Sequence, residues 1–184
     1  MGIIKNLKKE ILLLSVIFFY GCPSICNLPG VSYSGTVNDL IKLYPIQEVY
    51  NIGDVITYSV VIPSHITNFG PGNKTIDLYE ETEISKNPFD SINIDELKDN
   101  DVVVLEGENS ISGTKLVANL LYNPDEREYR YKAKITLTKP GNYSINLPYP
   151  FTIVFVNPEV CKNYLIETNV EGFDDDEIVT FTVQ

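Results

Sequence analysis

Residues 129–138, YRYKAKITLT, decide the fold class of this 184-residue chain. Every second side chain in this stretch is apolar, namely Tyr129, Tyr131, Ala133, Ile135 and Leu137. The side chains between them are basic or carry a hydroxyl, namely Arg130, Lys132, Lys134 and Thr136. Successive side chains of a β-strand point to opposite faces of the sheet. The pattern therefore predicts a strand with one face in the core and the other in water.

The rest of the chain repeats this pattern in shorter pieces. The further strand candidates are residues 55–62, 75–79, 102–105, 116–123, 143–147, 151–157 and 178–183. The continuous apolar run at 102–105 predicts a strand that is buried on both faces. Beyond the first 21 residues, no helical stripe exceeds ten residues, and residues 91–97 would form at most one helical turn. Many short strands between Pro- and Gly-containing turns predict an all-β fold, an antiparallel β-sandwich.

Two turns resemble landmarks of immunoglobulin-like sandwiches. Gly53-Asp54 precedes an alternating strand, and Pro140-Gly141-Asn142-Tyr143 follows the long one. The resemblance implies that Tyr143 closes the corner before its strand through its hydroxyl group, as the tyrosine corner of that family does. The chain has no Trp and more strand candidates than the seven of the standard fold. An extended or permuted variant of the sandwich is equally compatible.

Composition and charge exclude several classes of protein. The hydrophobic content of 43% and the charged content of 21% are ordinary for a globular domain, and they exclude wholesale disorder and a coiled-coil rod. The formal charge is −11, and without the three lysines and one glutamate of residues 1–21 it is −13. A chain with this much negative charge repels phosphate backbones. We therefore expect no nucleic-acid partner.

The first 21 residues have the pattern of a signal peptide. Lys5, Lys8 and Lys9 precede an apolar run over residues 11–20, which Gly21 and Cys22 follow. Ten helical residues extend about 15 Å, half the hydrocarbon thickness of a bilayer, so the run is too short to span a membrane. We therefore predict a signal peptide at 1–21, a tether at 22–38 and one β-sandwich domain at 39–184.

The sequence Phe19-Tyr20-Gly21-Cys22 resembles the lipobox of bacterial lipoproteins. The resemblance implies that Cys22 becomes the lipidated N-terminus of the mature protein. No Asp follows Cys22, so sorting in that family implies the outer membrane, on its periplasmic face. The Asn-, Ile- and Tyr-rich composition is similar to that of Bacteroidetes proteins. The alternative is a secreted protein cleaved near Gly21, with Cys22 as an ordinary thiol.

The cysteine count is consistent with an exported protein. Three cysteines leave one unpaired in an oxidising compartment. If Cys22 carries the lipid, Cys26 and Cys161 remain as the one pair that could form a disulfide. That disulfide would link the N-terminal tether to the C-terminal part of the fold. The alternative is two free thiols.

The chain contains few catalytic or metal-binding patterns. His65 is the only histidine, no Gly-x-Ser-x-Gly motif is present, and we expect neither an enzyme nor a cofactor. The acidic turn of Asp174, Asp175, Asp176 and Glu177 is a calcium candidate, with a solvated turn as the alternative.

Two further stretches have short patterns. Glu80, Glu81 and Glu83 predict an exposed sheet edge that discourages aggregation. Asp90-Ser91-Ile92 resembles the O-glycosylation acceptor of Bacteroidetes envelope proteins, which marks Ser91 as a candidate site.

Three functions follow from these features. The first is a non-catalytic envelope lipoprotein whose β-sandwich binds a protein or glycan partner. The second is an acidic inhibitor or immunity-type lipoprotein that captures a basic enzyme through its negative charge. The third is an enzyme that acts on envelope polysaccharide through two carboxylates. We expect the first.

Overall fold

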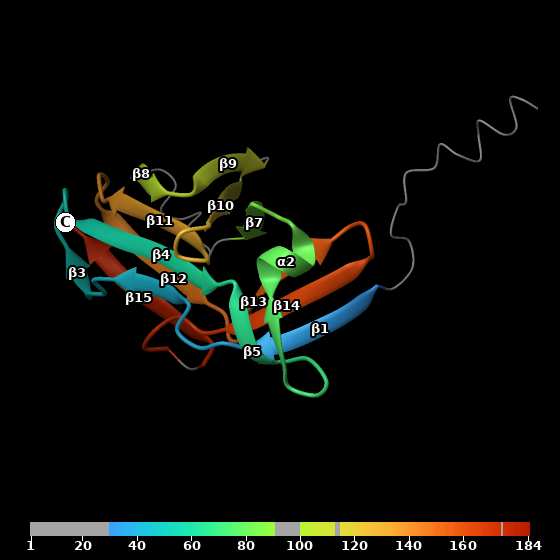
Figure 1. The fold of residues 1–184 in the computed structure, drawn as a ribbon. Helices are drawn as coiled ribbons and strands as arrows, with labels where there is room; N and C mark the ends of the chain where they lie inside the picture. The colour runs from blue at the N-terminus through green and yellow to red at the C-terminus, as the bar shows by residue number, and fades with distance from the viewer. Residues whose placement is uncertain (1–29, 91–99, 113–114, 174) are drawn as a thin grey trace, which may run out of the picture.

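A computed structural model describes residues 30–90, 100–112, 115–173 and 175–184. Within these residues nearly all of the regular secondary structure is β-strand, and one short helix is present (Figure 1). The elements in chain order are β1 (Val31–Thr36), β2 (Ile41–Tyr44), β3 (Val49–Tyr50), β4 (Val55–Pro63), β5 (His65–Phe69), β6 (Lys74–Asp77), α2 (Leu78–Thr82), β7 (Lys86–Asp90), β8 (Asp101–Glu106), β9 (Glu108–Ser112), β10 (Lys115–Asn123), β11 (Glu128–Thr136), β12 (Gly141–Leu147), β13 (Phe151–Asn157), β14 (Lys162–Thr168) and β15 (Glu177–Val183).

The strands form a β-sandwich, which confirms the predicted fold class. The largest sheet has the order β2-β4-β11-β10-β7, with β8 paired to β11 and β9 paired to β10. Two smaller sheets, β1-β14-β13 and β12-β15-β3, cover its inner face. Strand β1 pairs in parallel with β14, and β3 pairs in parallel with β15, so the N-terminal strands are bound to the last two strands of the chain. The hairpin of β5 and β6 extends beyond the two layers.

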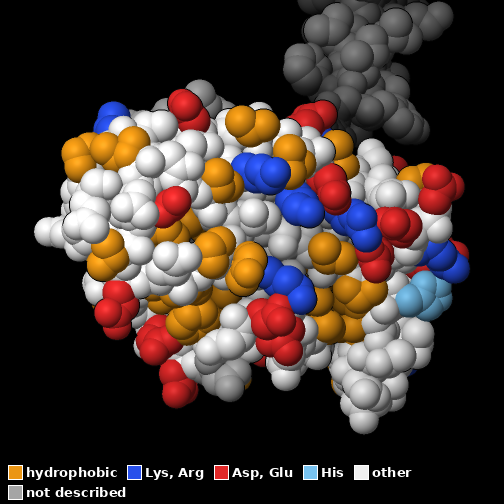
Figure 2. Space-filling view, turned by 90° about the vertical axis from the view of Figure 1, so that its left-hand side faces the viewer, with side chains coloured by type: hydrophobic (Ala, Val, Ile, Leu, Met, Phe, Trp, Pro, Cys, Tyr) orange, Lys and Arg blue, Asp and Glu red, His pale blue; other side chains and the backbone are white. Residues whose placement is uncertain are grey.

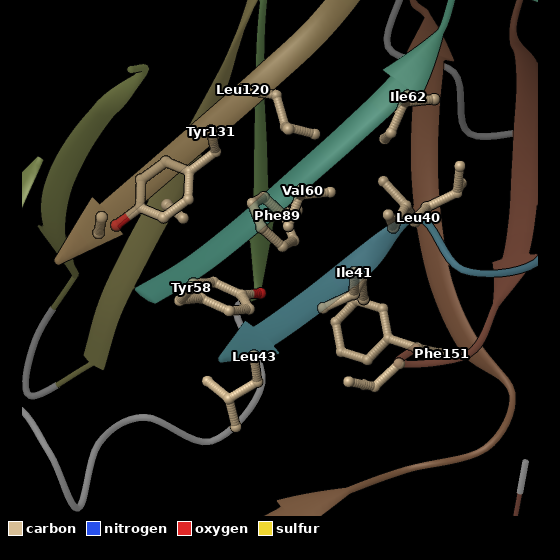
Figure 3. Close-up of a cluster of buried hydrophobic side chains, with 14 of the residues drawn as sticks. Leu40, Ile41, Leu43, Tyr58, Val60, Ile62, Phe89, Leu120, Tyr131 and Phe151 are labelled. Atoms are coloured by element: carbon tan, nitrogen blue, oxygen red, sulfur yellow. The ribbon is translucent and has the colours of Figure 1, made fainter. Parts of the chain in front are cut away.

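The alternating pattern of β11 fills the core as predicted. The side chains of Tyr129, Tyr131, Ala133 and Ile135 are fully buried. The ring of Tyr129 meets Phe155 of β13 at 4.8 Å between ring centroids, so this face of β11 packs on the opposite layer. Figure 3 shows Tyr131 among apolar side chains from β2, β4, β7 and β10. Edge-to-face aromatic pairs of this kind add to the stabilisation from buried apolar area.

The tyrosine corner predicted at Tyr143 is present. The Tyr143 hydroxyl donates a hydrogen bond of 2.9 Å to the backbone carbonyl of Lys139. The Tyr143 ring stacks on Phe181 of β15, with the ring centroids 5.3 Å apart. Together the two contacts fix the path of the chain between β11 and β12.

The prediction of one strand over residues 75–79 is wrong in its second half. Strand β6 ends at Asp77, and helix α2 begins at Leu78. The Asp77 carboxylate accepts hydrogen bonds from the backbone amides of Tyr79 (2.9 Å) and Glu80 (3.3 Å). An aspartate in this N-cap position satisfies amides that have no partner within the helix, and so it favours a helix start over a longer strand.

The expected acidic sheet edge is therefore an acidic helix. Glu80 and Glu81 lie in the first turn of α2, where negative charge interacts favourably with the helix dipole. Glu83 is the C-cap residue, in a left-handed conformation with φ 54°. The three glutamates thus do not protect a strand.

Two further predictions differ from the structure. Val103 and Leu105 of β8 are 55% and 47% exposed, so one face of this strand meets solvent. The prediction that residues 102–105 are buried on both faces is therefore wrong. Strand β1 lies inside the segment predicted as a tether, and the folded part of the described chain therefore includes Val31–Thr36. The helical turn predicted at 91–97 lies outside the described residues.

Candidate functional site

A small pocket lies between β1, the β5–β6 hairpin, α2 and β14. Its volume is about 140 Å³. Its lining combines aromatic rings with one carboxylate and two ammonium groups. The lining residues are Tyr33, Phe69, Pro71, Lys74, Ile76, Glu81, Lys162 and Tyr164. We call this site the aromatic pocket.

Three rings form the wall of the aromatic pocket. Tyr33 and Tyr164 are paired neighbours in β1 and β14, and their rings stack with centroids 5.6 Å apart. The Phe69 ring lies 6.2 Å from Tyr164. Gly35 of β1 makes the position of Phe69 possible, because a Cβ atom at Gly35 would lie 2.4 Å from that ring. A side chain at position 35 would therefore displace one wall of the pocket.

The polar groups of the aromatic pocket are arranged around Glu81. The Tyr164 hydroxyl donates a hydrogen bond of 2.5 Å to the Glu81 carboxylate, and the Lys162 ammonium lies 3.8 Å from the same oxygen. Burial raises the pKa of the Tyr164 phenol, and the hydrogen bond and negative charge of Glu81 raise it further. The phenol therefore keeps its proton at neutral pH and holds the carboxylate in place.

Helix α2 is fixed on both sides, so Glu81 is held firmly. The side-chain amide of Asn157, at the end of β13, donates a hydrogen bond of 2.6 Å to the backbone carbonyl of Glu81. At the other end, Asp77 caps the helix. The Asp77 carboxylate also binds the guanidinium of Arg127 and lies 3.0 Å from Nδ1 of His65.

Several hydrogen bonds set the ionisation of Asp77. Burial alone would raise its pKa. The Glu80 amide, the Arg127 guanidinium and the Tyr79 amide all favour the charged form, and together they hold the pKa of Asp77 below its ordinary value of 3.8. Asp77 is therefore a charged anchor at neutral pH although it is only 7% exposed.

His65 stands at the start of β5, and its side chain is half exposed. The neighbouring Ser64 is fully buried, so its hydroxyl is closed to a substrate. The neighbouring Asp77 caps α2 and binds Arg127.

The aromatic pocket suits an uncharged or zwitterionic ring with several hydroxyl groups. Phe69 and Tyr164 are each only 2% exposed, so the half-buried ring of Tyr33 is the ring face that could contact the C–H groups of such a ligand, while the carboxylate and ammonium groups accept and donate hydrogen bonds. Pockets for drug-sized ligands measure roughly 300–1,000 Å³, so this one takes a single ring or side chain.

Of the three cysteines, Cys161 is the one that lies in the described part of the chain. It directly precedes β14, with a left-handed φ of 51°, and the pairing of Val31 with Lys162 brings the N-terminal end of β1 beside it. A Cβ atom on Gly30 would lie 2.1 Å from the Cys161 carbonyl oxygen, so the two backbones touch. Cys22, Cys26 and Ser91 lie outside the described residues, and their predicted roles remain predictions.

One residue of the acidic turn, Asp176, connects this turn to the segment before β13. The Asp176 carboxylate accepts a hydrogen bond of 2.7 Å from the backbone amide of Tyr149, just before β13. Asp174 lies outside the described residues, and in the described part of the chain no three His, Cys, Asp or Glu side chains are grouped for a metal ion. The calcium prediction thus gains no support.

No local pattern in the sequence indicates the aromatic pocket. Tyr33 falls in the segment predicted as a tether, and Glu81 in the predicted sheet edge. The alternation of Tyr164, Ile166 and Thr168 is visible in the sequence and would have indicated β14.

Neither a scan against protein-family models nor a search of curated proteins finds a match to this chain. In the described part of the chain, no helix is both long and apolar enough to cross a membrane.

Proposed function

We propose that this chain is a non-catalytic lipoprotein of a bacterial cell envelope, anchored through Cys22, whose β-sandwich binds a glycan in the aromatic pocket. The observation that carries the proposal is the stack of Tyr33 on Tyr164 beside a carboxylate fixed by a phenol and an ammonium group. The half-buried ring of Tyr33, supported from behind by the buried Tyr164, and these fixed hydrogen-bonding groups would together hold one sugar ring.

The anchor is supported by the leader sequence and by the position of β1. Seven residues lie between Cys22 and Gly30, and the eight residue-to-residue steps span at most roughly 28 Å. Strand β1 contributes Tyr33 to the aromatic pocket. An acyl group on Cys22 would therefore hold the pocket close to a membrane, where envelope glycans are available.

The disulfide between Cys26 and Cys161 belongs to the same proposal. Three residues lie between Cys26 and Gly30, whose backbone touches that of Cys161. The four residue-to-residue steps span at most about 14 Å, and the Cα atoms of a disulfide lie about 4.4–6.8 Å apart, so the chain length permits the bond. The bond would fasten the anchored segment to the strand that carries Tyr164.

Binding of defined glycans tests the pocket. We expect the soluble protein without its leader to bind either the disaccharide unit of peptidoglycan or the lipid-free core oligosaccharide of lipopolysaccharide, measured by calorimetry. Tyr33→Ala and Glu81→Gln should each weaken that binding at least tenfold. Tyr44→Ala is the matched control, because Tyr44 is 73% exposed and lies outside the pocket lining. Equal binding by all four proteins, or binding of neither glycan, would contradict the proposal.

A further inference from the structure

The outer face of the largest sheet carries a second candidate surface, remote in sequence from the aromatic pocket. Lys132 and Lys134 point outward from the middle of β11, opposite the buried side of that strand. Figure 2 shows basic side chains in a short diagonal row across one face, with hydrophobic and acidic side chains beside the row. We call Lys132, Lys134 and their outward neighbours the β11 face.

The strand pairing identifies those neighbours. Lys134 pairs with Val103 of β8 on one side and with Thr57 of β4 on the other, and Thr57 pairs with Tyr44 of β2. Val103 is 55% exposed and Tyr44 is 73% exposed. From β8 through β11 and β4 to β2, this row therefore contains an apolar, a basic, a hydroxyl-bearing and an aromatic side chain. Leu105, 47% exposed beside the next row, extends the apolar strip.

The two lysines are unusual in so acidic a chain. The protein has a formal charge of −11, and the neighbouring Arg130 contacts three carboxylates, from Glu106, Glu126 and Glu128. Among the described residues, by contrast, no carboxylate lies within the 4.0 Å ion-pair distance of Lys132 or Lys134. Carboxylates of another molecule could therefore form ion pairs with Lys132 and Lys134 without displacing a carboxylate of this chain.

From this arrangement we infer that the β11 face binds an acidic, partly apolar segment of another protein in an extended conformation. Lys132 and Lys134 are alternate residues of one strand, so about 6.8 Å separates them. Carboxylates at alternate positions of an extended segment have the same spacing. Apolar side chains of the partner would cover Val103 and Leu105, and contact with these side chains favours a protein over a polysaccharide.

The rim of the β11 face argues against a membrane as the partner. Glu106 and Glu128 border the lysines on β8 and β11, and the Glu171 carboxylate pairs with Lys42 on the β2 side. A flat anionic bilayer would meet these carboxylates together with the lysines, and like charges repel. A single extended segment can lie on the lysines between the acidic groups. The inference is independent of the lipid anchor and of the glycan.

A peptide of ten residues with alternating Glu and Val is the probe, with fluorescence anisotropy as the readout. Lys132→Gln with Lys134→Gln should weaken binding at least tenfold, and Val103→Ser with Leu105→Ser at least fivefold. The matched control for the lysine pair is Lys86→Gln with Lys139→Gln, which removes the same charge outside both the β11 face and the aromatic pocket and should change binding less than twofold. Peptides with Ser in place of Val, or Gln in place of Glu, should bind more weakly to the wild type.

Three outcomes would overturn the inference. The first is no binding of the Glu-Val peptide by the wild type at millimolar concentration. The second is equal binding by the two lysine-pair variants, which would leave only a general charge effect. The third is binding to phosphatidylglycerol vesicles that needs Lys132 and Lys134 while the peptide does not, which would assign the face to a membrane. Circular dichroism of each variant shows that the fold is retained.

Discussion

Nδ1 of His65 lies 3.0 Å from a carboxylate oxygen of Asp77, the residue that caps α2. The guanidinium of Arg127 binds the same oxygen from the turn before β11. One nearly buried carboxylate thus joins β5, β6, α2 and β11. Because α2 carries Glu81, Asp77 also fixes the carboxylate of the aromatic pocket.

Two replacements of Asp77 should lower the free energy of unfolding by different amounts. Asp77→Asn keeps an oxygen that can cap α2 but removes the charge that binds Arg127 and His65. Asp77→Ala removes both, and loss of an N-cap and its hydrogen bonds costs about 1–2 kcal/mol. We therefore expect the free energy of unfolding, from urea titration at pH 7, to fall in the order wild type, Asn variant, Ala variant. Equal stability of all three would show that the capping geometry contributes nothing.

The stability of the wild type should depend on pH through Asp77. Its pKa is below 3.8 in the folded protein, so between that pKa and 3.8 the unfolded chain binds more protons, and the free energy of unfolding rises with pH. The stabilisation from charged Asp77 is thus fully present above pH 3.8 and is lost as the pH falls through the folded-state pKa. Urea titrations between pH 7 and pH 2.5 should show the wild type losing its advantage over Asp77→Asn in that acid range. If the free energies of unfolding of the wild type and of Asp77→Asn differ by the same amount at every pH, the prediction is contradicted.

Removal of the Tyr143 hydroxyl should weaken the corner without disturbing the core. Tyr143→Phe keeps the ring on Phe181 and loses the hydrogen bond to Lys139, which predicts a loss of about 0.5–1.5 kcal/mol in thermal or urea unfolding. Tyr44→Phe is the control, since Tyr44 is largely exposed. A loss of similar size in the control would remove the support for the corner.

The cysteines can be assigned by the intact mass of protein extracted from its native membrane. We expect acyl chains on Cys22, and a mass that rises by two hydrogens on reduction because Cys26 and Cys161 form a disulfide. Cys22→Ser should move the protein from the membrane to the soluble fraction. Three free thiols and no acyl group would overturn both assignments.

Local patterns predicted the strands well where one face is buried. β11 follows from the alternation of Tyr129 to Leu137, because alternation depends only on which side of a strand meets water. The error at Val103 arose because a continuous apolar run does not report how many layers cover it. Helix α2 was predictable in principle, since Asp77 followed by Glu80 three residues later resembles a capping box.

The aromatic pocket could not be predicted from local patterns. Tyr33, Glu81 and Tyr164 come from three distant segments, and the parallel pairing of β1 with β14 brings two of them together. The sequence VSYSGT of β1 contains few apolar residues, because most of its length is exposed at a sheet edge. Its strand conformation depends on the partner strand rather than on its own composition.

The parallel pairing of β1 with β14 also determines how the protein responds to force. The register joins six residue pairs, from Val31 with Lys162 to Thr36 with Glu167. When Cys26 and Cys161 are reduced, a pull on the N-terminus acts along the axis of β1, so it loads these pairs in shear, all at once, rather than peeling them apart one after another. The proposed disulfide would carry the load directly to Cys161, immediately before β14. An N-terminal anchor attached here could therefore bear mechanical tension between a membrane and a bound partner while the sandwich stays folded.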